Sequence, residues 1–217
     1  MIHQMLKREG LVRNHKRTER IYRREKLSLR MRKKKKRTGC LRVVMPEPTR
    51  VNERWSMDFV QDRIWQGRTF RVFTIVDDYS RECLALEVDT SIGGTRVARV
   101  LDQIVARRGH PAFLRSDNGP EFTGQALDEW AYRNDVKLDF IDPGKPNQNA
   151  FIESFNATLR RDCLNDNWFT SLAEARRIIE EWRMHYNGVR PHSSLRDMTP
   201  EEFSSSNNEK LNFQVAQ

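Results

Sequence analysis

Three carboxylates in the sequence have the types and positions expected of metal ligands. Asp58 lies inside an alternating apolar run, where an Asp costs free energy unless something binds it. Asp117 follows the apolar run 112–114 and precedes a predicted turn at 118–120, so it stands at the end of a predicted strand. Glu153 lies off the apolar stripe of a predicted helix. Such a set suits Mg²⁺ or Mn²⁺, and two such ions ~4 Å apart can activate a nucleophile in phosphodiester chemistry.

The residues around Glu153 suggest contacts to a polyanion. Asn149 and Arg160 share its predicted helix face, and Lys145 stands in the loop before that helix. Each is a candidate for positioning a phosphate or the DNA backbone, and solvated surface is the alternative.

Other titratable side chains have simpler interpretations. Asp77 and Asp78 follow a predicted strand and fit a turn. For Glu121 we expect capping or a surface ion pair, although it could contact the water shell of a metal. His192 could act as a general base, but a metal mechanism needs none, so we expect a structural hydrogen bond.

The elements that must position the three acids form an α/β pattern. Alternating apolar residues predict three successive strands, at 55–60, 70–76 and 83–88, joined by short turns. After them the sequence predicts a helix at 95–108, a strand ending near 114, a helix at 125–134 capped by Thr123, a strand at 136–141 and a helix at 147–163. The order βββαβαβα predicts a five-stranded mixed sheet flanked by helices.

Two further helices are predicted behind this core. One spans about 172–186, capped by Thr170 or Ser171, and a short one begins at 200 with Thr199 as its cap. We therefore divide the chain into a catalytic core at 51–163, a helical extension at 164–203 and a flexible tail at 204–217.

The positive charge belongs to one end of the chain. The formal net charge is +9, but residues 1–40 alone carry 16 Lys or Arg against three acids. Predicted helices at 1–9 and 14–26, joined at Gly10, resemble the end of a helix-turn-helix, with a solvated basic helix as the alternative. Residues 1–30 are thus a partial DNA-binding arm and 31–50 a basic linker. The candidate DNA contacts here are Arg17, Arg20, Arg23, Arg24, Lys33, Lys34, Lys35, Lys36 and Arg37.

Composition excludes several other classes of protein. No apolar run approaches ~18 residues, so we expect no membrane span. The basic first 40 residues do not suit a secretory signal. Three cysteines without a CxxC pair predict a reducing, cytoplasmic location.

The short sequence motifs around the three acids resemble those of a known protein family. They are Trp55-Ser56-Met57-Asp58, Val76-Asp77-Asp78-Tyr79-Ser80-Arg81, Ser116-Asp117-Asn118-Gly119-Pro120-Glu121-Phe122 and Asn149-Ala150-Phe151-Ile152-Glu153-Ser154-Phe155-Asn156. Together with Tyr186-Asn187 and Arg190-Pro191-His192, they resemble the second-frame (OrfB-type) DDE transposases of bacterial insertion sequences, which are similar to retroviral integrases. There are 35 residues between the second and third acids, as in the DDE signature.

The resemblance implies a fold, a reaction and partners. It implies an RNase H-like core in which Asp58, Asp117 and Glu153 bind two Mg²⁺ or Mn²⁺ ions, cut double-stranded DNA ends and transfer them to target DNA. It implies a homo-oligomer on DNA, in a bacterial cytoplasm and at the nucleoid when bound. The family carries more helix-turn-helix sequence ahead of a segment like residues 1–25, so we expect a shortened N-terminus and an upstream-frame DNA-binding protein as a possible partner. His3 and His15 lack a matching Cys pair, so we expect no structural zinc.

Two rival functions stay open on the sequence. An RNase H-like nuclease would share metal and fold but would not join DNA. A truncated, non-catalytic DNA-binding regulator of the element would use the basic arm alone, and the three intact acids argue against it.

Overall fold

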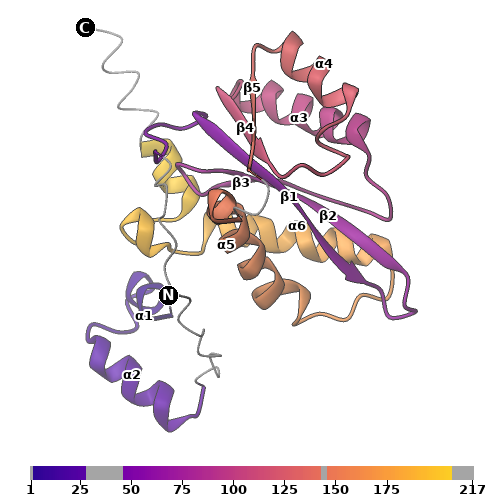
Figure 1. Cartoon of the computed structure of the whole chain (residues 1–217). Helices are drawn as coiled ribbons and strands as arrows, with labels where there is room; N and C mark the ends of the chain where they lie inside the picture. The colour runs from indigo at the N-terminus through magenta and orange to yellow at the C-terminus, as the bar shows by residue number, and fades with distance from the viewer. Residues whose placement is uncertain (1, 28–45, 143–145, 207–217) are drawn as a thin grey trace, which may run out of the picture.

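Five strands form one mixed sheet at the centre of the molecule (Figure 1). The computed structural model describes residues 2–27, 46–142 and 146–206. The strands are β1 (Arg54–Arg63), β2 (Thr69–Asp77), β3 (Cys83–Asp89), β4 (Phe113–Ser116) and β5 (Lys137–Phe140), in the spatial order β3-β2-β1-β4-β5. The first three pair antiparallel, whereas β4 pairs parallel to β1 and to β5. The predicted five-stranded mixed sheet is therefore confirmed.

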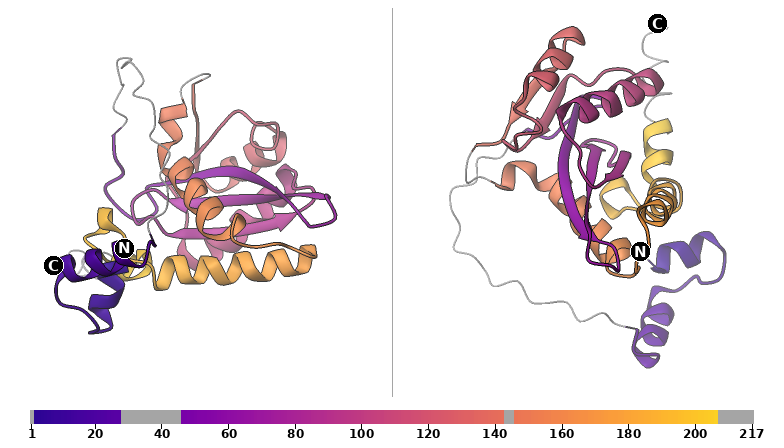
Figure 2. Two further views of the ribbon diagram at one scale, coloured as in Figure 1. Left: turned by 90° about the horizontal axis from the view of Figure 1, so that it is seen from below. Right: turned by 90° about the vertical axis from the view of Figure 1, so that its right-hand side faces the viewer.

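Helices cover both faces of this sheet (Figures 1 and 2). Helices α3 (Gly94–Arg108) and α4 (Gln125–Arg133) lie on one face, and α5 (Ala150–Leu159) and α6 (Leu172–Gly188) lie on the other. Each face has its own hydrophobic core, because side chains alternate along a strand. In β1, Trp55 and Met57 enter the α3–α4 core, whereas Val60 enters the α5–α6 core. Asp58, two residues before Val60, therefore faces α5.

The predicted helix at 147–163 is wrong as a continuous α-helix. It consists of a 3₁₀ turn η1 (Pro146–Asn149), α5, and a π-helical turn η2 (Arg160–Leu164). In η2 the amide of Asn165 donates to the carbonyl oxygen of Arg160 at 2.9 Å, the spacing of a π turn. The wider turn buries Cys163 and Leu164 in the α5–α6 core.

Helix caps agree with the sequence except at α4. The Ser171 hydroxyl accepts from the amide of Glu174 at 3.2 Å, as predicted for α6. Thr199 caps residues 200–206, and the amide of Glu202 donates to its hydroxyl at 3.2 Å. Helix α4 instead begins after Gly124, because the predicted cap Thr123 donates its hydroxyl to the carbonyl oxygen of Gly119.

The two ends of the described chain meet (Figure 2). Helix α1 (Ile2–Arg8) contacts the C-terminal segment through Gln4, which donates to Asp197 at 2.9 Å, and Arg8, which pairs with Glu202 at 2.6 Å. Helix α2 (His15–Arg24) carries the predicted contacts Arg17, Arg20, Arg23 and Arg24 on exposed positions, and Asn14 caps it as expected.

Some predictions about flexible segments fall outside the described residues. Lys33, Lys34, Lys35, Lys36, Arg37 and Lys145 belong to this group, as do residues 207–217 of the predicted tail. The predicted start of the tail at Ser204 is wrong, since residues 204–206 are helical and Ser204 is only 8% exposed. In the described ranges, no helix combines the length and the apolar character needed to cross a bilayer.

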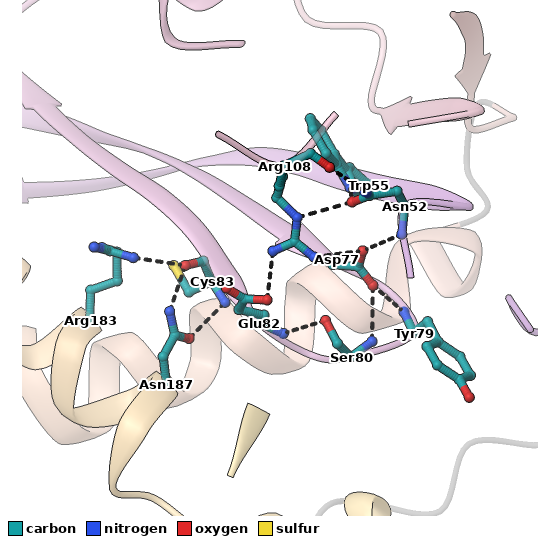
Figure 3. Close-up of polar contacts among 10 residues, drawn as sticks. All are labelled: Asn52, Trp55, Asp77, Tyr79, Ser80, Glu82, Cys83, Arg108, Arg183 and Asn187. Carbon is teal, nitrogen blue, oxygen red and sulfur yellow. Dashed lines mark hydrogen bonds and ion pairs between the residues drawn. The ribbon is translucent and has the colours of Figure 1, made fainter. Parts of the chain in front are cut away.

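Buried polar contacts close the β2–β3 turn (Figure 3). The Asp77 carboxylate accepts from the amides of Tyr79 and Ser80, each at 2.9 Å, and from the amide of Asn52 at 2.8 Å. Asp78 forms a buried ion pair with Arg54 at 2.6 Å. The structural interpretation of Asp77 and Asp78 is confirmed.

Strand β3 lies at the sheet edge, and an Asn side chain hydrogen-bonds to the backbone on its open side (Figure 3). Asn187, near the end of α6, accepts from the Cys83 amide at 2.9 Å and donates to the Cys83 carbonyl oxygen at 2.8 Å. Arg183 donates to the same carbonyl at 3.1 Å. The Asn187 amide thus substitutes for a neighbouring strand and attaches α6 to the sheet.

Asn187→Ala should lower the free energy of unfolding by about 1–3 kcal/mol, because it leaves the buried Cys83 amide without an acceptor. Urea unfolding measures this change. The control is Met184→Ala on the same helix, whose side chain is 63% exposed and whose loss should change stability by about 0.5 kcal/mol or less. Equal effects of the two substitutions would contradict the inferred role of Asn187.

Candidate active site

Asp58 is a carboxylate held in place on the α5 side of the sheet. Its Oδ1 accepts from the amide of Phe59 at 2.7 Å, and its Oδ2 accepts from Nδ2 of Asn156 at 2.8 Å. The pKa of Asp58 is raised to about 6, first by burial and then by the charges of Asp117 and Glu153, against the lowering effect of the two hydrogen bonds. The structure therefore brings Asp117 and Glu153 within electrostatic range of Asp58.

Strand register explains why Asp117 comes to Asp58. Strand β4 runs parallel to β1, and Ser56 pairs with Arg115. Asp58 and Asp117 each follow these residues by two positions, so the register places them side by side. Asp117 Oδ1 accepts from the amide of Gly119 at 3.0 Å, which turns the chain away after the strand. A Cβ at Gly119 would lie 3.0 Å from that same oxygen, so any other residue here would push the Asp117 carboxylate out of its position.

Glu153 approaches from α5 across a groove. The groove has a volume of about 380 Å³ and we call it the Asp58–Glu153 groove. Its walls are Asp58, Phe59, Val60 and Gln61 of β1 and Glu153, Asn156, Ala157 and Arg160 of α5 and the following turn. The exposed Glu153 thus faces the buried strand carboxylate across an opening that reaches solvent.

The three acids do not close onto one point. In the ranges that the structure describes, no three His, Cys, Asp or Glu side chains form a group that could hold a metal ion as they stand. Neighbouring carboxylates repel one another, and a cation bound between them would offset that repulsion. The donor set itself is all oxygen and suits Mg²⁺ or Mn²⁺.

Arg115 and Asn156 are site residues that the sequence reasoning missed. Arg115 is 2% exposed, pairs with Asp139 of β5 and donates to the carbonyl oxygen of Gln148 at 3.0 Å. It thereby fixes the segment that leads into α5 and Glu153. Asn156 could have been found by its spacing, because a residue three positions after Glu153 shares its helix face.

The other predicted site residues differ in whether they line the groove. Arg160 lines the groove and donates to the Gln61 carbonyl oxygen at 2.5 Å. Asn149 is only 4% exposed and is not among the groove residues, so burial removes it from the surface where a DNA backbone could pass. Glu121 forms an ion pair with Arg71, which confirms the expected salt bridge. The guanidinium of Arg71 also stacks 3.9 Å from the centre of the Phe59 ring.

Comparison with known proteins identifies the family. Residues 48–146 and 134–200 each match the integrase core domain. The chain is 47% identical, over 94% of its length and 74% of the relative, to an uncharacterized 31.7 kDa protein of insertion element IS407 from Burkholderia multivorans. The chain belongs to the insertion-sequence transposases of the retroviral integrase superfamily.

More distant relatives agree with this assignment. The putative transposase of insertion sequence IS150 from Escherichia coli is 25% identical over 91% of this transposase and 74% of the relative. The HTLV-2 integrase catalytic core domain, solved in complex with magnesium, superposes with a TM-score of 0.58, at 16% identity over 71% of this chain and 97% of the viral one. The viral likeness confirms the RNase H-like fold.

Asp58→Asn should raise the free energy of unfolding by roughly 1–3 kcal/mol at about pH 8 without divalent metal. Folding raises the carboxyl pKa from 3.8 to about 6, so the wild type loses stability as pH rises between these values, and Asn does not. Urea unfolding in chelator at about pH 8 and about pH 4 measures the difference, which should vanish at the lower pH. The exposed Asp166→Asn is the control, and an Asp58→Asn protein no more stable than wild type at about pH 8 would contradict the prediction.

Proposed function

We propose that this transposase cuts the ends of its element and joins them to target DNA at Asp58, Asp117 and Glu153. The observation that carries this proposal is the convergence of three acids from β1, the end of β4 and α5, where two of the charges raise the pKa of the third. A partly buried carboxylate with two like charges near it is unfavourable by itself, and a cation-binding role accounts for it.

The same three side chains would hold Mg²⁺ or Mn²⁺, with two ions per site as the specific hypothesis. Bound there, the metal would supply activation of the nucleophile and stabilisation of the leaving oxygen. The nucleophile is water or a DNA hydroxyl in the first step and the free 3′-hydroxyl of the element in the second.

The protein's own side chains would orient the reacting groups. Asn156 donates to Asp58 Oδ2 and leaves that carboxylate one orientation toward the groove. Arg160, on the groove wall, is suited to a phosphate of the bound strand. Arg115 acts at a distance, since it anchors the segment before α5 and so sets the position of Glu153.

We further propose that Arg17, Arg20, Arg23 and Arg24 of α2 contact the DNA backbone, together with Lys33, Lys34, Lys35, Lys36, Arg37 and Lys145. Exposed arginines on one basic helix support the first group. Two DNA ends must be joined to one target, so a homo-oligomer on DNA is the proposed working state. A cytoplasmic location and a DNA-binding partner from an upstream frame belong to the same proposal.

A joining assay separates this function from its two rivals. A labelled, pre-cut element end is incubated with circular target DNA and Mg²⁺. A transposase yields joined product, an RNase H-like nuclease yields only hydrolysis, and a non-catalytic regulator yields neither.

Glu153→Gln should reduce strand transfer by about a hundredfold or more, because the amide cannot hold a divalent cation as a carboxylate does. DNA binding, measured by fluorescence anisotropy, should stay within about twofold, since no backbone contact is removed. The matched control is Glu181→Gln on α6, whose carboxylate is 61% exposed and which should join DNA like wild type. Full activity of Glu153→Gln with Mg²⁺ would rule out the proposed site.

A further inference from the structure

A second cavity lies on the opposite flank of α5 from the Asp58–Glu153 groove. It has a volume of about 430 Å³ and lies between α5, the β2–β3 turn and the segment after α6. Its polar lining is cationic and hydroxyl-rich: Arg81, Ser154, Thr158, Arg190, His192 and Ser194. We call it the Arg81–His192 pocket.

Two buried nitrogens of this pocket have no partner. Nη1 of Arg81 and Nε2 of His192 are both buried and form no hydrogen bond within the described part of the chain. The Arg81 guanidinium stacks 3.7 Å from the centre of the Phe151 ring, which fixes its plane. Burial lowers the pKa of Arg81. Asp78, the acid that opposes this shift most, is already paired with Arg54. Buried polar groups in native proteins are normally satisfied, so this pair points to a ligand.

The charges around the pocket favour an anion. Burial lowers the pKa of His192 most, and the nearby charges of Arg190 and Arg81 lower it further. Two cations therefore lie close to its ring, one of which, Arg190, is paired with Asp162. The one acid in the lining is Asp197, and its carboxylate already accepts from Gln4 of α1 at 2.9 Å. A phosphate with its oxygens toward the guanidinium and the Ser154 and Thr158 hydroxyls matches this donor set.

Helix α5 is the wall shared by the groove and the pocket. At 100° per residue, the groove residues Glu153 and Arg160 lie on one flank, and Phe151 and Thr158 lie on the other. Between the flanks, the solvent-facing ridge carries small exposed residues, Ala150, Ser154 and Ala157. A nucleic acid backbone can therefore cross α5 without meeting a long side chain.

We propose that the Arg81–His192 pocket binds a phosphodiester group of the DNA strand whose reacting phosphate occupies the Asp58–Glu153 groove. This inference rests on the proposed function, because it takes DNA to be the ligand of the groove. The pocket anchors the strand beyond the reacting phosphate, and the strand passes over the ridge of α5.

The test is a binding experiment without divalent metal, so that it does not depend on cleavage or joining. The full chain is titrated with short duplexes that carry one element end and a single neutral methylphosphonate at successive positions. One position near the end should weaken wild-type binding about tenfold, the size expected for one lost charged hydrogen-bonded contact.

Two matched variants assign that position to the pocket. Ser154→Glu places a carboxylate beside the proposed phosphate and should weaken binding to natural DNA about tenfold, while the methylphosphonate at the sensitive position should cause little further loss. Ser154→Gln is the matched comparison, because Gln has nearly the size of Glu without its charge. It should bind natural DNA more tightly than Ser154→Glu does, and the methylphosphonate at the sensitive position should still weaken its binding. Gln103→Glu, exposed on α3, controls for the change in net charge. Equal losses in Ser154→Glu and Gln103→Glu would overturn the proposal.

Inorganic phosphate separates a DNA site from a site for a free anion. At constant ionic strength, phosphate should shift the NMR signals of the His192 ring in wild type and not in Ser154→Glu. If phosphate shifts the His192 signals but no methylphosphonate position weakens binding, the assignment to DNA is overturned. If neither effect is seen, the anion site itself is overturned. An inactive joining assay combined with a sensitive methylphosphonate position would reject the proposed chemistry and keep the pocket.

Discussion

The structure depends on one partly buried carboxylate, Asp58, on the central strand of the sheet. Asp58 sits in the middle of β1, between two hydrophobic cores, and two further acids face it. Burial and like charge both oppose its ionised form, and only two hydrogen bonds favour it. Such an arrangement lowers the stability of the fold, which agrees with the metal-binding role proposed for the three acids.

The rest of the core holds the elements that bring the acids together. Arg115 ties β4 and β5 to the start of α5, and Asn156 ties α5 back to Asp58. On the other side of the same helix, Phe151 packs under the guanidinium of Arg81. Helix α5 is therefore fixed on both flanks, which explains how one exposed Glu on a short helix keeps its position relative to a strand.

Much of this arrangement was predictable from local patterns. Alternation in β1 and β2, the apolar stripe of α3, and the caps Asn14, Ser171 and Thr199 all act over a few residues, so the sequence predicts them well. Three of the failures involve contacts that compete with local preference. Thr123 donates to a turn rather than capping α4, the π turn at Arg160 serves core packing, and Asn149 is buried by the fold around it.

The sequence by itself determined the strand and helix order, the three acids and the family, because these depend on residue type and spacing along the chain. Only the tertiary structure decided which acids share a space, since the parallel β1–β4 register makes Asp58 and Asp117 level and the packing of α5 adds Glu153. It also decided which polar groups lack partners. Arg81 and His192 are far apart in sequence, and each has a nitrogen without a partner in the described residues. They line one pocket because the segment after α6 folds back against α5. Burial and long-range register are properties of the packed chain, so no local pattern carries them.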